Sequence, residues 1–180
     1  MYNQLHFIPP HQKHSSNLMT SFLTWFRGYS EVGQKSEPQL LDVESLPIGI
    51  RVSHSPNPVS AMQGGPSNRP YTWLHQTTVE SIGKSLQIVE FGGFGWNGEQ
   101  WILGNYTGKP FTSGDFASWY SCPDAIIEFG KEYSDPNNWT GGDNLSSSMT
   151  KWYFIGTDEA GNSYRGDAVI EMLPQLAKVT

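Results

Sequence analysis

The chain of 180 residues contains a single cysteine, Cys122, and few charged side chains. One cysteine excludes an intrachain disulfide, and we expect this thiol to serve as a small buried hydrophobic group. Charged residues make up 16% of the chain, against about 25% in typical proteins, and lysine and arginine form no cluster. Because binding to nucleic acid needs a basic face that neutralises phosphates, the sequence predicts no nucleic-acid partner.

Long apolar runs are also absent. No run approaches the roughly 20 residues of a membrane span, so we expect no membrane partner. The longest apolar stretch near the N-terminus, residues 18–26, is interrupted by Thr20, Ser21 and Thr24. It does not resemble a signal peptide, and the sequence therefore predicts a cytoplasmic rather than a secreted protein.

Aromatic residues, glycine and proline are abundant. Phenylalanine, tryptophan and tyrosine make up 13% of the chain, beside 19 glycines and 12 prolines. The net charge of −6 lies in the second half, which is typical of a solvated acidic surface. From residue 46 onward, short segments of period two alternate with turn residues. This pattern predicts a mainly β protein, an antiparallel β-barrel or β-sandwich of the jelly-roll or up-and-down type.

The N-terminal region is expected to differ from the rest. Residues 1–15 contain Pro9-Pro10 and three histidines, and they predict an extended arm that lies on the domain or on a second subunit. Residues 17–27 have apolar side chains at helical spacing and predict a buried helix that ends at Gly28. Residues 16–180 would form one β-rich domain. The arm makes a homo-oligomer one of the partners to consider.

The expected strands lie at 48–54, 71–80, 86–91, 101–103, 152–156 and 164–172. Residues 56–70, rich in proline and glycine, predict a long loop, and residues 123–144 predict irregular connections. Asp158 to Asn162 predict a hairpin loop with Gly161 at positive φ. Thr112 and Asp115 resemble a capping box, which predicts one short helix near 113–120.

Strand parity selects three ionisable residues. His54 shares its parity with Ile50 and Val52, and His75 shares its parity with Trp73 and Val79. Glu90 shares its parity with Leu86 and Ile88, although Val89 and Phe91 make that strand apolar on both faces. We expect His54, His75 and Glu90 to converge in the interior. Two imidazoles and a carboxylate are a typical set for a divalent metal, the candidate cofactor.

Without a metal, the same three residues are candidates for general acid–base catalysis, with pKa values moved by burial. The ordinary alternative is that each histidine is a core residue bonded to backbone. Glu80 would replace Glu90 if a bulge reversed the register. The loops at Asp135-Pro-Asn-Asn and Asp143-Asn144 contain oxygen ligands that suit Ca²⁺, but they also contain ordinary turn residues.

The aromatic residues suggest a ligand. We expect most rings to fill the core, and we select Trp73, Tyr71, Trp96 and Trp101 as candidate ligand-binding residues. The predicted function is binding of a small organic molecule in an aromatic-lined interior, with metal-assisted or acid–base catalysis of the lyase or isomerase type as its enzymatic form. A non-catalytic carbohydrate-binding module with exposed tryptophans is one alternative. An accessory or structural subunit that docks through its N-terminal segment is another.

Overall fold

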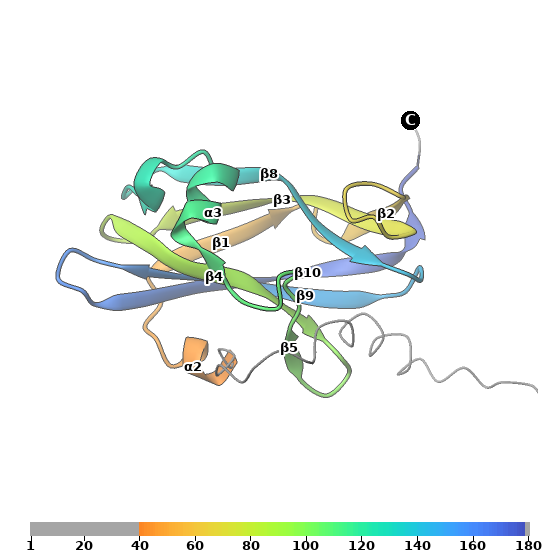
Figure 1. The fold of residues 1–180 in the computed structure, drawn as a ribbon, viewed down its shortest axis with the longest axis horizontal. Coiled ribbons are helices and arrows are strands. Elements are labelled where there is room, and N and C mark those ends of the chain that lie inside the picture. The colour runs from red at the N-terminus through yellow and green to blue at the C-terminus, as the bar shows by residue number, and fades with distance from the viewer. Residues whose placement is uncertain (1–39, 179–180) are drawn as a thin grey trace, which may run out of the picture.

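A computed structural model describes residues 40–178. Within this range strands take up 56% of the residues and helices 9%, which confirms the predicted mainly β fold. Figure 1 shows two layers of strands that face each other, one containing β1, β3 and β8 and the other containing β4, β9 and β10. The expected arm and the expected helix at 17–27 lie outside the described residues. None of the described helices is long and apolar enough to cross a membrane.

We name the first layer sheet B. Its central strand is β3 (Tyr71–Ser81), which is antiparallel to all its neighbours. On one edge it pairs with β1 (Ile50–Ser55) and β2 (Val59–Gln63), and on the other with β8 (Glu132–Gly142). Alternate side chains of β3 point toward the second layer, and these residues, Trp73, His75, Thr77 and Val79, are all buried.

We name the second layer sheet A. Its long strands are β4 (Leu86–Trp96), β9 (Ser148–Thr157) and β10 (Ser163–Leu176), paired in the order β4, β9, β10. Three short strands, β5 (Trp101–Leu103), β6 (Phe111–Thr112) and β7 (Ile126–Ile127), pair with the free edge of β4. The turn between β9 and β10 has Gly161 at φ +82°, which confirms the predicted hairpin.

The two layers join along one side and remain open along the other. β2 pairs with β3 in sheet B and, in parallel, with β10 in sheet A. On the same side Ile50 of β1 crosses Gly166 of β10 so closely that a Cβ at Gly166 would lie 2.3 Å from the Ile50 carbonyl oxygen. No ladder joins β4 to β8 among the described strands, so the structure is a sandwich or open barrel.

Two short helical segments follow β6. Helix α3 (Ser113–Trp119) begins at a capping box in which the Thr112 and Asp115 side chains each accept a hydrogen bond from the other residue's backbone. This confirms the predicted helix at 113–120. α3 buries Phe116 in the core, and the 3₁₀ turn η2 (Pro123–Ala125) continues from it. In Figure 1, α3 appears between the two layers.

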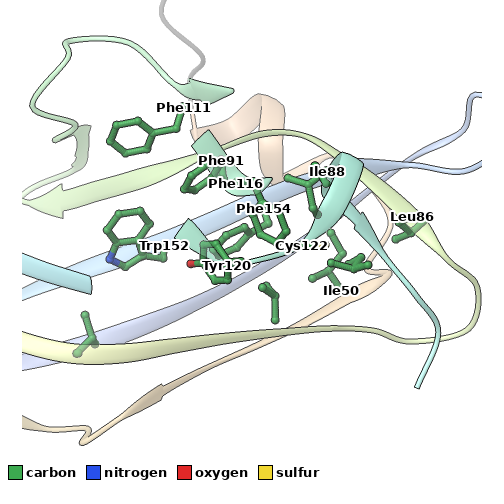
Figure 2. Packing of buried hydrophobic residues seen from close by; sticks show 14 of the residues in the cluster. Ile50, Leu86, Ile88, Phe91, Phe111, Phe116, Tyr120, Cys122, Trp152 and Phe154 are labelled. Atoms are coloured by element: carbon green, nitrogen blue, oxygen red, sulfur yellow. The ribbon is translucent and has the colours of Figure 1, made fainter. Parts of the chain in front are cut away.

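The core between the sheets is mainly aromatic. Figure 2 shows Phe91, Phe116, Phe154 and Tyr120 packed together, with Trp152 beside them. Phe91 and Phe154 stack with 5.5 Å between ring centroids, and Phe116 stacks on Tyr120 at 4.3 Å. Most of the described rings therefore belong to the core, as expected.

A second, smaller cluster lies on the outer face of sheet A. It consists of Phe94, Tyr153 and Val43, the last from helix α2 (Leu40–Glu44). The sequence did not predict α2. It also did not predict β2 or β8, because Pro58 and Pro136 indicated loops. Both strands are compatible with proline because Pro58 precedes β2 and β8 is an edge strand, which can contain a residue without a backbone N–H.

Candidate site: an interior polar layer and an adjoining hollow

Polar side chains gather on the inward face of sheet B, inside the sandwich. We call this group the interior polar layer: His54 of β1, His75 and Thr77 of β3, and Asp135 and Asn138 of β8. Register places them side by side, because His54 pairs with Thr77 and His75 pairs with Asn138. Period-two alternation thus brings two of the three predicted site residues together.

His54 is fixed at both ring nitrogens. Its Nε2 lies 3.3 Å from the Ala168 carbonyl oxygen, which only accepts, so Nε2 carries the proton. Its Nδ1 lies 3.0 Å from the Thr77 hydroxyl oxygen and therefore accepts from it. Thr77 in turn accepts a 2.8 Å hydrogen bond from the side-chain amide of Asn138. The chain of hydrogen bonds from Asn138 through Thr77 to His54 and Ala168 crosses from sheet B to sheet A.

His75 is fixed at one ring nitrogen only. The residue is 2% exposed, and its Nδ1 lies 3.3 Å from the carbonyl oxygen of Trp73. That oxygen only accepts, so Nδ1 carries the proton and Nε2 is the bare basic nitrogen. Nε2 is buried and has no hydrogen-bond partner within the described structure. A buried acceptor left in this state is costly, and such groups are uncommon in folded proteins.

Burial keeps both imidazoles uncharged at neutral pH. The loss of hydration and, to a smaller extent, the neighbouring His54 lower the pKa of His75 to about 4. Burial also lowers the pKa of His54, partly offset by the hydrogen bond to Ala168. A neutral imidazole with a free Nε2 can accept a proton or a hydrogen bond, which is what a general base or a ligand-binding acceptor needs.

Two other ionisable groups are Tyr120, which borders the interior polar layer, and Asp135, which belongs to it. Tyr120, at the C-terminal end of α3, is buried with its hydroxyl toward Thr77. Burial and the nearby Asp135 carboxylate raise the pKa of Tyr120, so its hydroxyl remains protonated. Asp135 accepts a hydrogen bond from the backbone of Asn137, and burial raises the pKa of its carboxyl group. No parity signal was available for Asp135, because the sequence did not predict β8 as a strand.

Glu90 does not join the histidines, which corrects the prediction for this residue. A bulge in β4 between Ile88 and Glu90 shifts the pairing with β9 by one residue. Ile88 and Phe91 therefore both face the core, and Glu90 turns to the outer face. There it accepts a 3.0 Å hydrogen bond from the Tyr153 hydroxyl. Glu80, the expected substitute, forms an ion pair with Arg51 at the surface.

The structure offers no set of ligands for the divalent metal. Within residues 40–178, no three side chains among histidine, cysteine, aspartate and glutamate are arranged to hold an ion. The two loops considered for Ca²⁺ also differ from expectation: Asp135 lies in β8, and Asp143 forms an ion pair with Arg69 at 3.0 Å. The Cys122 thiol is buried and donates to the Ile126 carbonyl oxygen.

A small hollow of about 50 Å³ opens at one end of the sandwich. Trp73 and Met172 line it and are nearly buried, so they form its floor. The Trp73 indole donates a 2.9 Å hydrogen bond to the Leu173 carbonyl oxygen, which fixes the ring. The remaining lining is small or polar: Gly95, Thr140, Gly141, Gly142, Asp143, Asn144, Ser146, Ser148, Met149 and Thr150.

Trp73 is thus the one predicted ligand-binding residue that lines this hollow. Trp96 and Trp101 form a tilted pair at the β4–β5 hairpin, with 5.3 Å between centroids, and Trp101 packs on the outer cluster. Tyr71 packs against the main core. The polar lining corresponds to Gly141-Gly142 and the Ser- and Thr-rich run at 146–150, which were not selected from the sequence as candidate site residues.

Comparison with known proteins adds no family. No family model matches the chain, and no curated protein matches it. Two solved structures resemble it weakly. One is a Bordetella pertussis protein provisionally called ApaA, with 12% identity over 74% of this chain and 98% of its own and a TM-score of 0.43. The other, the structural-genomics target SoR45, has 14% identity over 75% and 95% and a TM-score of 0.40.

Proposed function

We propose that this protein binds a small organic molecule at the open end of its sandwich. The observation that supports this function most directly is the hollow itself, with an immobilised indole as its floor and hydroxyl and amide side chains around it. Binding sites for small molecules combine an apolar surface with a few placed polar groups in this way. Its volume of about 50 Å³ fits only a small ligand or one end of a larger one.

The test is a fragment screen by NMR with ¹⁵N-labelled protein. Ligands of the hollow should shift the indole N–H resonance of Trp73, which is assigned through the Trp73→Phe variant. They should bind that variant more weakly, because the ring is smaller and its hydrogen bond to Leu173 is lost. Trp101→Phe is the matched control and should bind normally. If no fragment in the screen moves the Trp73 resonance, the proposal is rejected.

An enzymatic form of this function would use His75. Its Nε2 is an unprotonated base in the interior, and acid–base chemistry of the lyase or isomerase type needs such a group. Glu90 would take no part, because it lies on the outer face with Tyr153. Docking of the N-terminal segment on a partner, the accessory-subunit alternative, concerns residues outside those described and remains a separate proposal.

Carbohydrate binding is the second candidate, and one surface pair supports it. Tyr106 is 53% exposed and stacks on Trp139, with 6.3 Å between centroids and 19° between ring planes. Exposed rings of this kind can pack against sugar faces. Affinity electrophoresis in gels with soluble cellulose or glycol chitin tests the idea. The Tyr106→Ala variant should lose any retardation, and equal mobility of native protein with and without polysaccharide would reject it.

A further inference from the structure

The bare Nε2 of His75 is the strongest indication of a ligand in the molecule. The other nitrogen anchors the ring to the Trp73 carbonyl, so the orientation of Nε2 is set. The side chain is 98% buried, since 2% of the residue is exposed. A fixed, buried acceptor without a protein donor is suited to receive a hydrogen bond from a bound molecule.

A matching donor lies across the sandwich. The indole Nε1 of Trp152 is also buried without a hydrogen-bond partner in the described structure, as is the Tyr120 hydroxyl beside the interior polar layer. Trp152 pairs with Ala168, and the Ala168 carbonyl contacts the ring of His54. His54 lies 5.4 Å from His75 between ring centroids, so the indole and the two imidazoles belong to the same level of the interior. In Figure 2 the Trp152 nitrogen lies on the side of the indole away from Phe91 and Phe154.

The end hollow leads toward this level. Trp73 is its floor, and His75 follows on the same face of β3 two residues further along. On sheet A, Thr150 lines the hollow and Trp152 follows it on the inward face of β9. His75 and Trp152 are therefore the next inward-facing residues after two residues that line the hollow, Trp73 and Thr150. Gly142, which has no side chain, lies beside the Trp73 ring. Met172, whose side chain is flexible, lines the same hollow.

We propose that the hollow continues to His75 Nε2 and Trp152 Nε1 when the Trp73 ring gives up its hydrogen bond to Leu173 and turns aside, and that its ligand is a small neutral molecule bearing a hydroxyl group. This inference rests on the proposed binding function and names the class of ligand. A hydroxyl can donate to the bare imidazole nitrogen and accept from the indole N–H at the same time. The rest of the ligand would contact apolar side chains, among them Met172.

The interior selects against a charged ligand. Burial keeps His54 and His75 neutral, and the same loss of hydration would penalise an ammonium or carboxylate group. An ether is uncharged but can make only one of the two hydrogen bonds, because it accepts from Trp152 and has no proton to donate to His75. The chemistry of His75 Nε2 and Trp152 Nε1 therefore distinguishes an alcohol from an amine and from an ether of similar size.

The experiment uses isobutanol, isobutylammonium and tetrahydrofuran as probes of full-length ¹⁵N-labelled protein at pH 7.5. Isobutanol should move the Nε2 resonance of His75 upfield and the Trp152 indole proton downfield, because both become hydrogen-bonded. Isobutylammonium should move neither. An Nε2 resonance of His75 that is already at its hydrogen-bonded position without ligand would overturn the inference. A His75 shift as large with tetrahydrofuran would also overturn it.

Failure of the inference is distinguishable from failure of the proposed function. If isobutanol or another fragment moves Trp73 but leaves His75 and Trp152 unchanged, the hollow binds ligands and the extension to His75 is wrong. If nothing moves Trp73, the function itself is wrong. His75→Phe removes the acceptor and keeps a ring, and it should weaken isobutanol binding by about tenfold. Gln76→Ala, on the exposed face of the same strand, is the control and should bind isobutanol as the native protein does.

Discussion

The rings of His54 and His75 lie edge to face, with 5.4 Å between their centroids and 86° between their planes. They come from neighbouring strands of one sheet and face the interior together. At this distance a charge on one ring disfavours a charge on the other, and burial disfavours a charge on either. The folded structure therefore favours the state in which both rings are neutral.

This pair makes the stability of the fold sensitive to mild acid. The pKa of His75 is about 4 in the folded protein and about 6.5 in an unfolded chain. As the pH falls below 6.5 the unfolded chain takes up a proton that the folded protein refuses, so unfolding becomes more favourable until about pH 4. The expected loss is about 3 kcal/mol from His75, and His54 acts in the same direction.

Urea unfolding at pH 7.5, 6.0 and 4.5 measures this loss. The His75→Phe variant is the matched comparison, because its stability should depend less on pH over the same range. If the free energy of unfolding depends equally on pH in the native protein and in the variant, other groups cause the acid sensitivity. Histidine resonances followed by NMR should show His75 still unprotonated at pH 5.5, where a free imidazole is mostly charged.

Tyr153 and Glu90 should behave as a unit separate from the histidines. Tyr153→Phe removes a 3.0 Å hydrogen bond to a carboxylate and should lower the free energy of unfolding by about 1–2 kcal/mol. Glu90→Gln should leave the titration of both histidines unchanged. A change in the His75 titration in the Glu90→Gln variant would contradict the position of Glu90 on the outer face.

Thr112 should contribute measurably to stability through its capping box. Thr112→Ala removes the acceptor for the Asp115 backbone and should destabilise the protein by about 1 kcal/mol. Ser118→Ala, at an exposed position of the same helix, should change the stability little. Thermal unfolding of the two variants side by side is sufficient, and equal melting temperatures would contradict the role of the cap.

Cys122 should be chemically inert in the folded protein. Burial raises the pKa of its thiol to about 11, so the thiolate that reacts with disulfide reagents is scarce at pH 8. Modification by dithionitrobenzoate should be at least about a hundredfold slower than in urea. Rapid modification of the native protein would show that the thiol is accessible and ionised.

Much of the fold could be predicted because the strands that face the core alternate strictly. β3 matches its expected bounds within one residue, and His75 is buried as its parity requires. Turn chemistry was equally informative at Gly161 and at the Thr112 cap. Parity gave the position of His54 as well, because β1 contains no bulge.

The errors arose where backbone irregularity or position in the sheet overrides local pattern. A bulge before Glu90 reverses the face of every later residue of β4, and because Val89 and Phe91 make the strand apolar on both faces, its pattern does not show which way Glu90 points. Pro136 is acceptable only because β8 has one partner strand, a property of the whole sheet. Asp135 and Asn138 of β8 were therefore not predicted as members of the interior polar layer.

The pairing of β2 with β10 has a consequence for the order in which the chain can fold. Met172 and Leu173 pair with Val59 and Ser60, so the contacts that hold β2 to sheet A form only after β10 has been synthesised. Contacts so distant in sequence slow folding. Until the end of β10 is made, β2 has an unpaired edge and the growing chain is exposed to wrong strand pairing. The sandwich thus cannot be completed before β10 is available, and deletion of residues 172–176 should prevent the pairing of β10 with β2.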